Sequence, residues 1–172
     1  MDDFKNISLR ARIAYSILCL NNVIREKEAD NNLEKDWQLI LDKLWEITEI
    51  EFVDEWMYSV SCRIPSSILE DPFDSNEDIT EREFIALKNL YSNSDSVTLE
   101  IIELVYNLGT IEMYGRIEDC SPRTLDILEE IVTKLKYNNI ELPNLAQFKK
   151  YTMNNNGWGV TFNRADLTDP LK

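Results

Sequence analysis

Histidine, the side chain that carries out most acid–base and nucleophile-activating chemistry in proteins, is absent from the 172 residues of this chain. Without imidazole there is no Ser–His or Cys–His nucleophile pair, no HExxH zinc site and no imidazole base working near neutral pH. The three cysteines, Cys19, Cys62 and Cys120, are too few and too widely spaced for a four-thiolate zinc site. The sequence therefore excludes most hydrolase mechanisms and the common zinc sites.

Carboxylate chemistry remains open, because a pair of acids can hydrolyse a glycoside or hold a divalent metal for phosphoryl transfer. Glu46 and Glu49 lie three residues apart and would share a helix face, as would Glu100 and Glu103. A chain with 32 acids in 172 residues contains such pairs by chance. We therefore interpret the chain as a binding protein with no catalytic residue, no cofactor and no metal, and keep a carboxylate enzyme as an alternative.

The stretch from Asp74 to Asp78 places acids or amides at positions one, three and five of a calcium-binding loop. Position six is Ile79, where the loop needs glycine for its turn. Position twelve is Ile85, where a bidentate glutamate should complete the ligand shell. The stretch is therefore not a dedicated calcium site.

The acids are better suited to attracting a basic partner. Eighteen Lys and Arg against 32 Asp and Glu give a formal charge of −14, which repels nucleic acid and anionic lipid. Between Glu46 and Glu83, twelve acids stand against only Arg63 and Arg82, a net charge of −10. Such a region can be a solvated face, but it also speeds encounter with a cationic protein by about 10-fold or more. We predict that ten acids bind the partner: Glu46, Glu49, Glu51, Asp54, Glu55, Glu70, Asp71, Asp74, Glu77 and Asp78.

Apolar residues spaced three and four apart predict helices along most of the chain. Only four glycines are present, which disfavours a β-sandwich or a Rossmann turn. The length is that of one domain. We therefore predict an all-α fold, a single irregular bundle of about six to seven helices over residues 1–172. Residues 152–172 form an irregular tail that packs on the bundle or extends from it. The predicted helices span about 8–28, 33–48, 52–64, 80–91, 96–112 and 122–137, with a short one at 143–151.

Several residues predict where these helices begin. Ser8 is a candidate N-cap for the first helix. Thr80 and Glu83 match a capping box, in which each side chain accepts a hydrogen bond from a free amide at the helix start. Ser121 followed by Pro122 predicts another start, because the missing proline N–H does no harm in the first turn.

Pro65 and Gly109 interrupt the helical pattern. Pro65 is expected to end the third helix, because the residue before a proline is disfavoured in helix. The stretch from there to Ile79 then becomes a long acidic loop with one short turn around residues 67–70. Gly109 lies inside a helix, where it predicts either a bend or the close approach of another backbone.

The four tryptophans divide into two kinds. Trp37, Trp45 and Trp56 fall on apolar helix stripes and are predicted to lie in the core, with Phe52 on the same stripe as Trp56. Trp158 stands between two glycines in the tail. We favour its insertion into a groove on the domain over presentation to a partner, because an exposed tryptophan favours aggregation.

The sequence also bears on location. The N-terminus is acidic and has no apolar core, so we predict no secretory signal, and no apolar run approaches the roughly 20 residues that a bilayer requires. Three unpaired, widely spaced cysteines fit a reducing compartment. We therefore expect a cytoplasmic protein that does not bind membranes.

The chain resembles the small, acidic, all-helical immunity proteins that are encoded beside bacterial polymorphic or contact-dependent toxins. The resemblance is loose but covers most of the chain. It rests on the Trp-rich helical middle and on the segments Ser8–Tyr15, Ser121–Leu125 and Asn156–Gly159.

This resemblance implies a cytoplasmic inhibitor that binds a cognate toxin domain, often a basic nuclease, and blocks its active site or substrate groove. The acids between Glu46 and Asp78 would then occupy the positive groove in place of nucleic-acid phosphates. A helical adaptor or regulatory module that binds a different basic protein is the alternative. The oligomeric state stays open.

Overall fold

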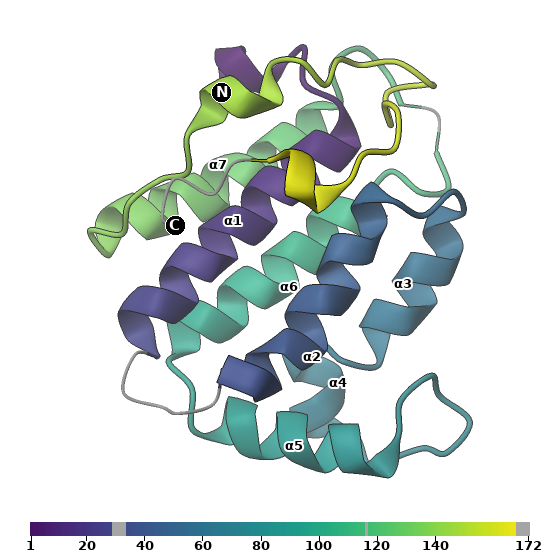
Figure 1. The fold of residues 1–172 in the computed structure, drawn as a ribbon, viewed down its shortest axis with the longest axis vertical. Helices are drawn as coiled ribbons and strands as arrows, with labels where there is room; N and C mark the ends of the chain where they lie inside the picture. The colour runs from purple at the N-terminus through teal and green to yellow at the C-terminus, as the bar shows by residue number, and fades with distance from the viewer. Residues whose placement is uncertain (29–33, 116, 168–172) are drawn as a thin grey trace.

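Helix α1 (Leu9–Lys27) lies at the centre of the bundle, between α6 (Ser96–Thr110) and α7 (Pro122–Tyr137) (Figure 1). The computed structural model describes residues 1–28, 34–115 and 117–167. Thirteen of the nineteen residues of α1 are buried, on all sides of the helix. A helix covered all round belongs in the interior, so α1 is the element on which the other helices pack.

The remaining helices form one end and one side of the bundle. Helix α2 packs on α1, α3 and α5, while α4 packs on α5 and α6. Figure 1 shows α3 along one edge and α5 across the end of the bundle opposite the N-terminus. These helices are α2 (Glu34–Trp45), α3 (Val53–Ser61), α4 (Pro65–Glu70) and α5 (Glu81–Ser92), with 3-10 turns η1 (Asp2–Phe4), η2 (Glu46–Thr48), η3 (Leu145–Phe148) and η4 (Arg164–Asp166).

The predicted all-α class is confirmed: the described residues contain seven α-helices and no strand. The predicted boundary between the first two helices, near residues 29–33, lies outside the described residues. The short helix predicted at 143–151 is wrong as an α-helix, since only the 3-10 turn η3 forms there. After Phe148 the chain bends back, and the Tyr151 carbonyl accepts a hydrogen bond from the amide of Ser8 at 2.9 Å.

Pro65 begins a helix instead of only ending one. Helix α3 stops at Ser61, and Pro65 is the first residue of α4, where its missing N–H costs nothing. The next free amide, that of Ser66, donates to Glu103 Oε1 at 2.7 Å. The predicted 65–79 loop was therefore too long, because residues 65–70 are helical and only 71–80 connect α4 to α5.

The predicted helix starts are correct in place but not always in mechanism. The Thr80–Glu83 capping box forms as expected. Ser8 and Ser121 stand at the N-cap positions of α1 and α7, but neither hydroxyl caps its helix. The Ser8 hydroxyl is buried against Gly159, and the Ser121 hydroxyl donates to Glu112 Oε1 at 2.8 Å.

The tail supplies the cap that Ser8 does not. The amide of Leu9 donates to the Gly157 carbonyl at 3.0 Å, and the amide of Arg10 donates to the Trp158 carbonyl at 3.3 Å. These amides have no partner within their own helix, so backbone carbonyls from the tail satisfy them. Of the two arrangements expected for the tail, its described part therefore packs on the bundle, as Figure 1 shows. Residues 168–172 lie outside the described residues.

Gly109 makes room for a side chain and not for another backbone. A Cβ atom at this position would overlap the six-membered ring of Trp56. Trp56 is fully buried, and its indole Nε1 donates to the Lys43 carbonyl at 3.0 Å. Trp37 and Trp45 are also buried, so the core positions predicted for these three tryptophans are confirmed.

Arg12 joins α1 to the N-terminal segment and to the start of α7 inside the bundle. Its side chain is completely buried, and its guanidinium donates to the carbonyls of Ile7 at 2.9 Å and Cys120 at 2.8 Å. It also donates to Thr124 Oγ1 at 2.7 Å and to the Lys5 carbonyl at 3.2 Å. Burial lowers the pKa of Arg12 to about 10, so the group stays charged at neutral pH.

We expect Gly159→Ala to lower the free energy of unfolding by about 2 kcal/mol or more. The residue has φ +80°, and an added Cβ would overlap the side chain of Ser8. Urea unfolding measures the change. The matched control is Gly115→Ala, whose Cβ would lie 3.8 Å from its nearest neighbour, Arg123 Nη2. The control should change stability by less than about 0.5 kcal/mol. Equal effects of the two substitutions would contradict the packing of the tail on α1.

Candidate partner-binding surface

The ten acids predicted to bind a partner form two groups, at the two ends of α3. One group lies before and on the first turn of α3: Glu46, Glu49, Glu51, Asp54 and Glu55. The other lies at the end of α4 and in the segment that follows: Glu70, Asp71, Asp74, Glu77 and Asp78. In Figure 1 the two groups fall at opposite ends of the edge that α3 forms. The nine residues of α3 are about 14 Å long, so the acids make two patches and not one.

Most of these acids are not neutralised within the molecule. Nine of the ten are exposed, and Glu46 is half-buried. Within the described residues only two of them form ion pairs, Glu46 with Lys43 at 2.9 Å and Asp78 with Arg63 at 3.6 Å. The remaining carboxylates face solvent, so the negative potential at both ends of α3 is available to a partner.

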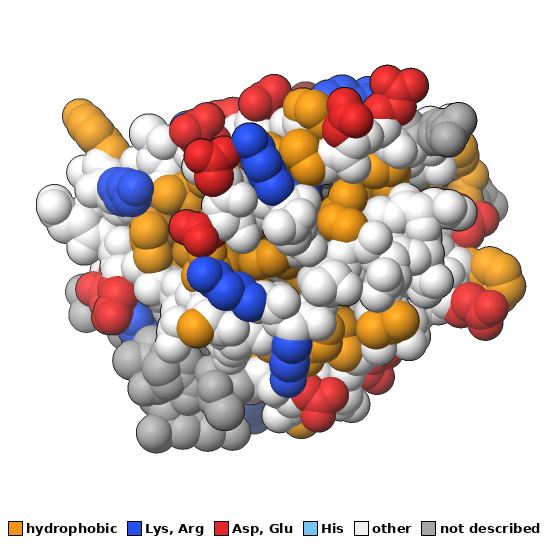
Figure 2. Space-filling model, turned by 90° about the horizontal axis from the view of Figure 1, so that it is seen from above, with side chains coloured by type: hydrophobic (Ala, Val, Ile, Leu, Met, Phe, Trp, Pro, Cys, Tyr) orange, Lys and Arg blue, Asp and Glu red, His pale blue; other side chains and the backbone are white. Residues whose placement is uncertain are grey.

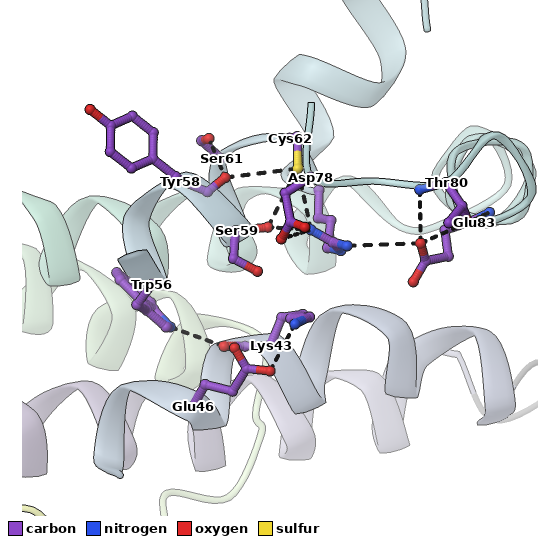
Figure 3. Close-up of polar contacts among 11 residues, drawn as sticks. Lys43, Glu46, Trp56, Tyr58, Ser59, Ser61, Cys62, Asp78, Thr80 and Glu83 are labelled. Atoms are coloured by element: carbon purple, nitrogen blue, oxygen red, sulfur yellow. Dashed lines mark hydrogen bonds and ion pairs between the residues drawn. The ribbon is translucent and has the colours of Figure 1, made fainter. Parts of the chain in front are cut away.

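Arg63 anchors the acidic segment that joins α4 to α5. Its side chain is buried, with Nη1 3.6 Å from Asp78 Oδ2 and Nη2 3.8 Å from Glu83 Oε2. Its carbonyl accepts a hydrogen bond from the Tyr91 hydroxyl at 2.8 Å. In Figure 3 Asp78 lies beside Ser59 near the end of α3, while Glu83 lies on the other side of the contacts, next to Thr80. The segment between α4 and α5 is therefore held at its C-terminal end by a buried cation.

Exposed aromatic side chains stand beside the first acidic group. Phe52, Tyr58 and Tyr114 are 59%, 63% and 80% exposed. In Figure 3 Tyr58 projects away from the polar contacts around Asp78, whereas Trp56 points toward α2. The predicted core position of Phe52 is wrong. Helix α3 begins at Val53, and Phe52 precedes it with an extended backbone, so it lies outside the helical periodicity.

Tyr114, in the turn after α6, lies against the exposed side of α3. Its hydroxyl is 3.9 Å from Met57 Sδ. Desolvation and the neighbouring Tyr58 and Asp54 raise the pKa of Tyr114. We call the resulting surface the α3 face and define it as Glu51, Phe52, Asp54, Glu55, Tyr58 and Tyr114.

The aromatic residues of the α3 face are of the types that are enriched at protein-binding surfaces. Tyrosine and phenylalanine supply large contact areas with few rotatable bonds, and they are enriched in the centres of interfaces. Sequence reasoning found its acids but missed its aromatic residues. The available indication was that Tyr58 falls off the stripe formed by Trp56 and Val60, while Tyr114 follows the predicted end of a helix at about residue 112.

Three of the four carboxylates considered for catalysis take part in structural contacts, and the fourth, Glu49, is exposed. Glu100 Oε2 lies 2.6 Å from Lys134 Nζ, and Glu103 accepts the Ser66 amide at the start of α4. Glu46 pairs with Lys43. Across residues 1–28, 34–115 and 117–167, no group of three or more Cys, Asp or Glu side chains is placed to hold a metal ion.

Comparison with known proteins gives no relative: no family model, curated protein or solved structure matches this chain. Over the described part of the chain, every helix is too short or too polar to span a bilayer. A functional interpretation must therefore rest on the surface itself.

We expect Glu83→Ala to destabilise the fold in a pH-dependent way. The Thr80 amide donates to Glu83 Oε2 at 2.9 Å, and this hydrogen bond, with smaller contributions from the Thr80 hydroxyl and Arg63, lowers the pKa of Glu83 below 4.5. Because the folded-state pKa lies below the unfolded value, the charged carboxylate stabilises the fold above pH 4.5. This contribution is lost as the pH falls through the folded-state pKa.

The measurement is urea unfolding of the wild type and the variant between pH 7 and pH 3. The difference should be about 1 kcal/mol at pH 7 and should shrink in acid. Glu81→Ala is the control, since Glu81 is an exposed acid in the same helical turn with no side-chain hydrogen bond among the described residues. A difference for Glu83→Ala that is constant with pH would show that the capping carboxylate does not carry the effect.

Proposed function

We propose that this protein is an immunity protein, which binds a cognate bacterial toxin domain in the cytoplasm and neutralises it without catalysing a reaction. The toxin domain that fits best is a basic one, such as a nuclease with a positive substrate groove. The observation that carries the proposal is the α3 face, where exposed aromatic side chains stand among acids that have no cationic partner in the described structure.

The aromatic residues and the acids have different parts in the proposed interface. Phe52, Tyr58 and Tyr114 give apolar area that water leaves on binding, and this area supplies affinity. The acids on both ends of α3 raise the rate of encounter with a cationic surface and disfavour acidic partners. An interface of standard size needs about 800 Å² on each side. That is about a tenth of the 9361 Å² that this molecule exposes.

Another face of the molecule has a different charge pattern, which supports the choice of the α3 face. Figure 2 shows the end of the bundle near the N-terminus, where acidic, basic and apolar side chains are interspersed. Ion pairs form at this end, between Lys149 and Asp3 at 3.3 Å and between Arg164 and Asp42 at 2.9 Å. Neighbouring cations offset much of the negative charge there, whereas the acids of the α3 face lack such neighbours.

A growth-rescue experiment tests the proposal. Bacteria would express a toxin domain found encoded beside this gene, with or without this protein. We expect survival only when the protein is present.

We expect a variant with four reversals, Glu51→Lys, Asp54→Lys, Glu55→Lys and Asp71→Lys, to associate with the toxin domain at least about 10-fold more slowly and with weaker salt dependence. Unchanged binding by this folded variant would retire the acidic surface. Survival that does not depend on the protein would favour a helical adaptor with another basic partner.

We expect Tyr58→Ala and Tyr114→Ala each to weaken toxin binding by about 30-fold or more, the effect of losing a central aromatic anchor. Isothermal titration calorimetry with the purified toxin domain measures the change. The matched control is Tyr137→Ala, since Tyr137 is 87% exposed and ends α7, far along the chain from α3. A loss of affinity as large for Tyr137→Ala as for the other two would place the interface elsewhere.

A further inference from the structure

A groove of about 560 Å³ separates the C-terminal tail from the segment that leads into α3. One wall is formed by Glu49, Glu51 and Val53, and the other by Trp158, Val160 and Thr161. The two walls are fixed relative to each other, because the Phe162 amide donates to the Thr48 carbonyl at 2.8 Å. The groove is therefore a built feature of the fold that adjoins the α3 face through Glu51.

Arg10 also lines this groove, and its buried guanidinium has an unpartnered nitrogen. The residue is only 5% exposed, and its amide binds the Trp158 carbonyl on the tail side. Its Nη1 donates to the Ile47 carbonyl, while its buried Nε has no partner. Within the described structure no carboxylate lies within ion-pair distance of Arg10. A guanidinium has five N–H donors, so Arg10 can donate a further hydrogen bond to an oxygen of a ligand.

The acidic side chains in the walls of the groove favour a cationic group on the ligand. Glu49 and Glu51 are exposed, and neither forms an ion pair with a described residue. The indole of Trp158 is partly buried and lines the same groove, and an aromatic face attracts cations. A ligand that satisfies the whole groove therefore carries an acceptor oxygen for Arg10 and a cation for the two glutamates.

Simple ions satisfy only half of these requirements. A phosphate or carboxylate would bind Arg10 but would be repelled by Glu49 and Glu51. A free amine or metal cation would be attracted to the glutamates but would leave Arg10 without an acceptor. An arginine or lysine residue within a peptide offers both groups, a backbone carbonyl and a cationic side chain, a few ångströms apart.

We propose that the groove between the tail and α3 binds an arginine- or lysine-containing segment of the partner. The backbone carbonyl of that segment accepts a hydrogen bond from Arg10, and its basic side chain lies over Trp158 against Glu49 and Glu51. The assignment of the segment to a toxin domain rests on the proposed function. The chemistry of the groove does not.

The experiment is an NMR titration of the full ¹⁵N-labelled chain with the peptide Ac-Gly-Arg-Gly-NH2. We expect saturable shifts of the Trp158 indole N–H and the Gly159 amide, with a dissociation constant on the order of 1 mM. The peptide with glutamine in place of arginine should bind about 10-fold more weakly, because it keeps the carbonyls but lacks the cation.

Two variants and one control locate the binding. Glu51→Gln and Trp158→Leu should each weaken binding by about 5-fold or more, whereas Glu129→Gln, an exposed acid on α7, should not. Glu51 is at the surface, so its substitution leaves the fold intact even if Trp158→Leu loosens the tail. Absence of saturable shifts in the wild type, or equal binding of the glutamine peptide, would overturn the groove assignment. Neither result involves the toxin, so the growth-rescue experiment judges the proposed function separately.

Discussion

The burial of Arg12 in the middle of an apolar bundle is the constraint on which most of this structure depends. A guanidinium without water is tolerated only when its donors find acceptors, and here the acceptors come from the N-terminal segment and the start of α7. These segments must therefore close around the first turns of α1 for the charge to be stable. Arg12 thus couples elements that are more than 100 residues apart in sequence.

Arg10 is a second buried arginine, on the opposite side of the helix. Two residues along an α-helix differ by about 200° in direction, so Arg10 and Arg12 point to different sides of α1. Arg12 reaches toward α7, and Arg10 reaches toward η2 through the Ile47 carbonyl. The tail then covers the first amides of α1, which brings Trp158 beside the segment leading into α3. The groove therefore follows from the way in which the free amides at the start of α1 find hydrogen-bond acceptors in the tail.

The helices could be predicted from the sequence because apolar spacing determines them. Predictions of burial failed where tertiary contacts determine which side chains are covered. Apolar spacing predicted a helix over about 8–28, but not that all sides of α1 are buried, including two arginines that no hydrophobic pattern would place inside. Phe52 matched the spacing of a core stripe and is exposed, because periodicity does not show that the helix begins one residue later. The acids of the candidate site were visible as composition. The grouping of Tyr58, on α3, with Tyr114, in the turn after α6, was not.

The burial of one arginine beneath exposed acids explains how an acidic surface coexists with a stable fold. Between residues 46 and 83 the sequence holds two arginines, but Arg63 is buried under the segment that it anchors. Only Arg82 is exposed in that stretch, so the surface there is more negative than the sequence count suggests. Water screens repulsion among exposed acids, while the arginine inside makes hydrogen bonds in a low dielectric. Placing the cation inside therefore stabilises the acidic segment and leaves its carboxylates available to a basic protein.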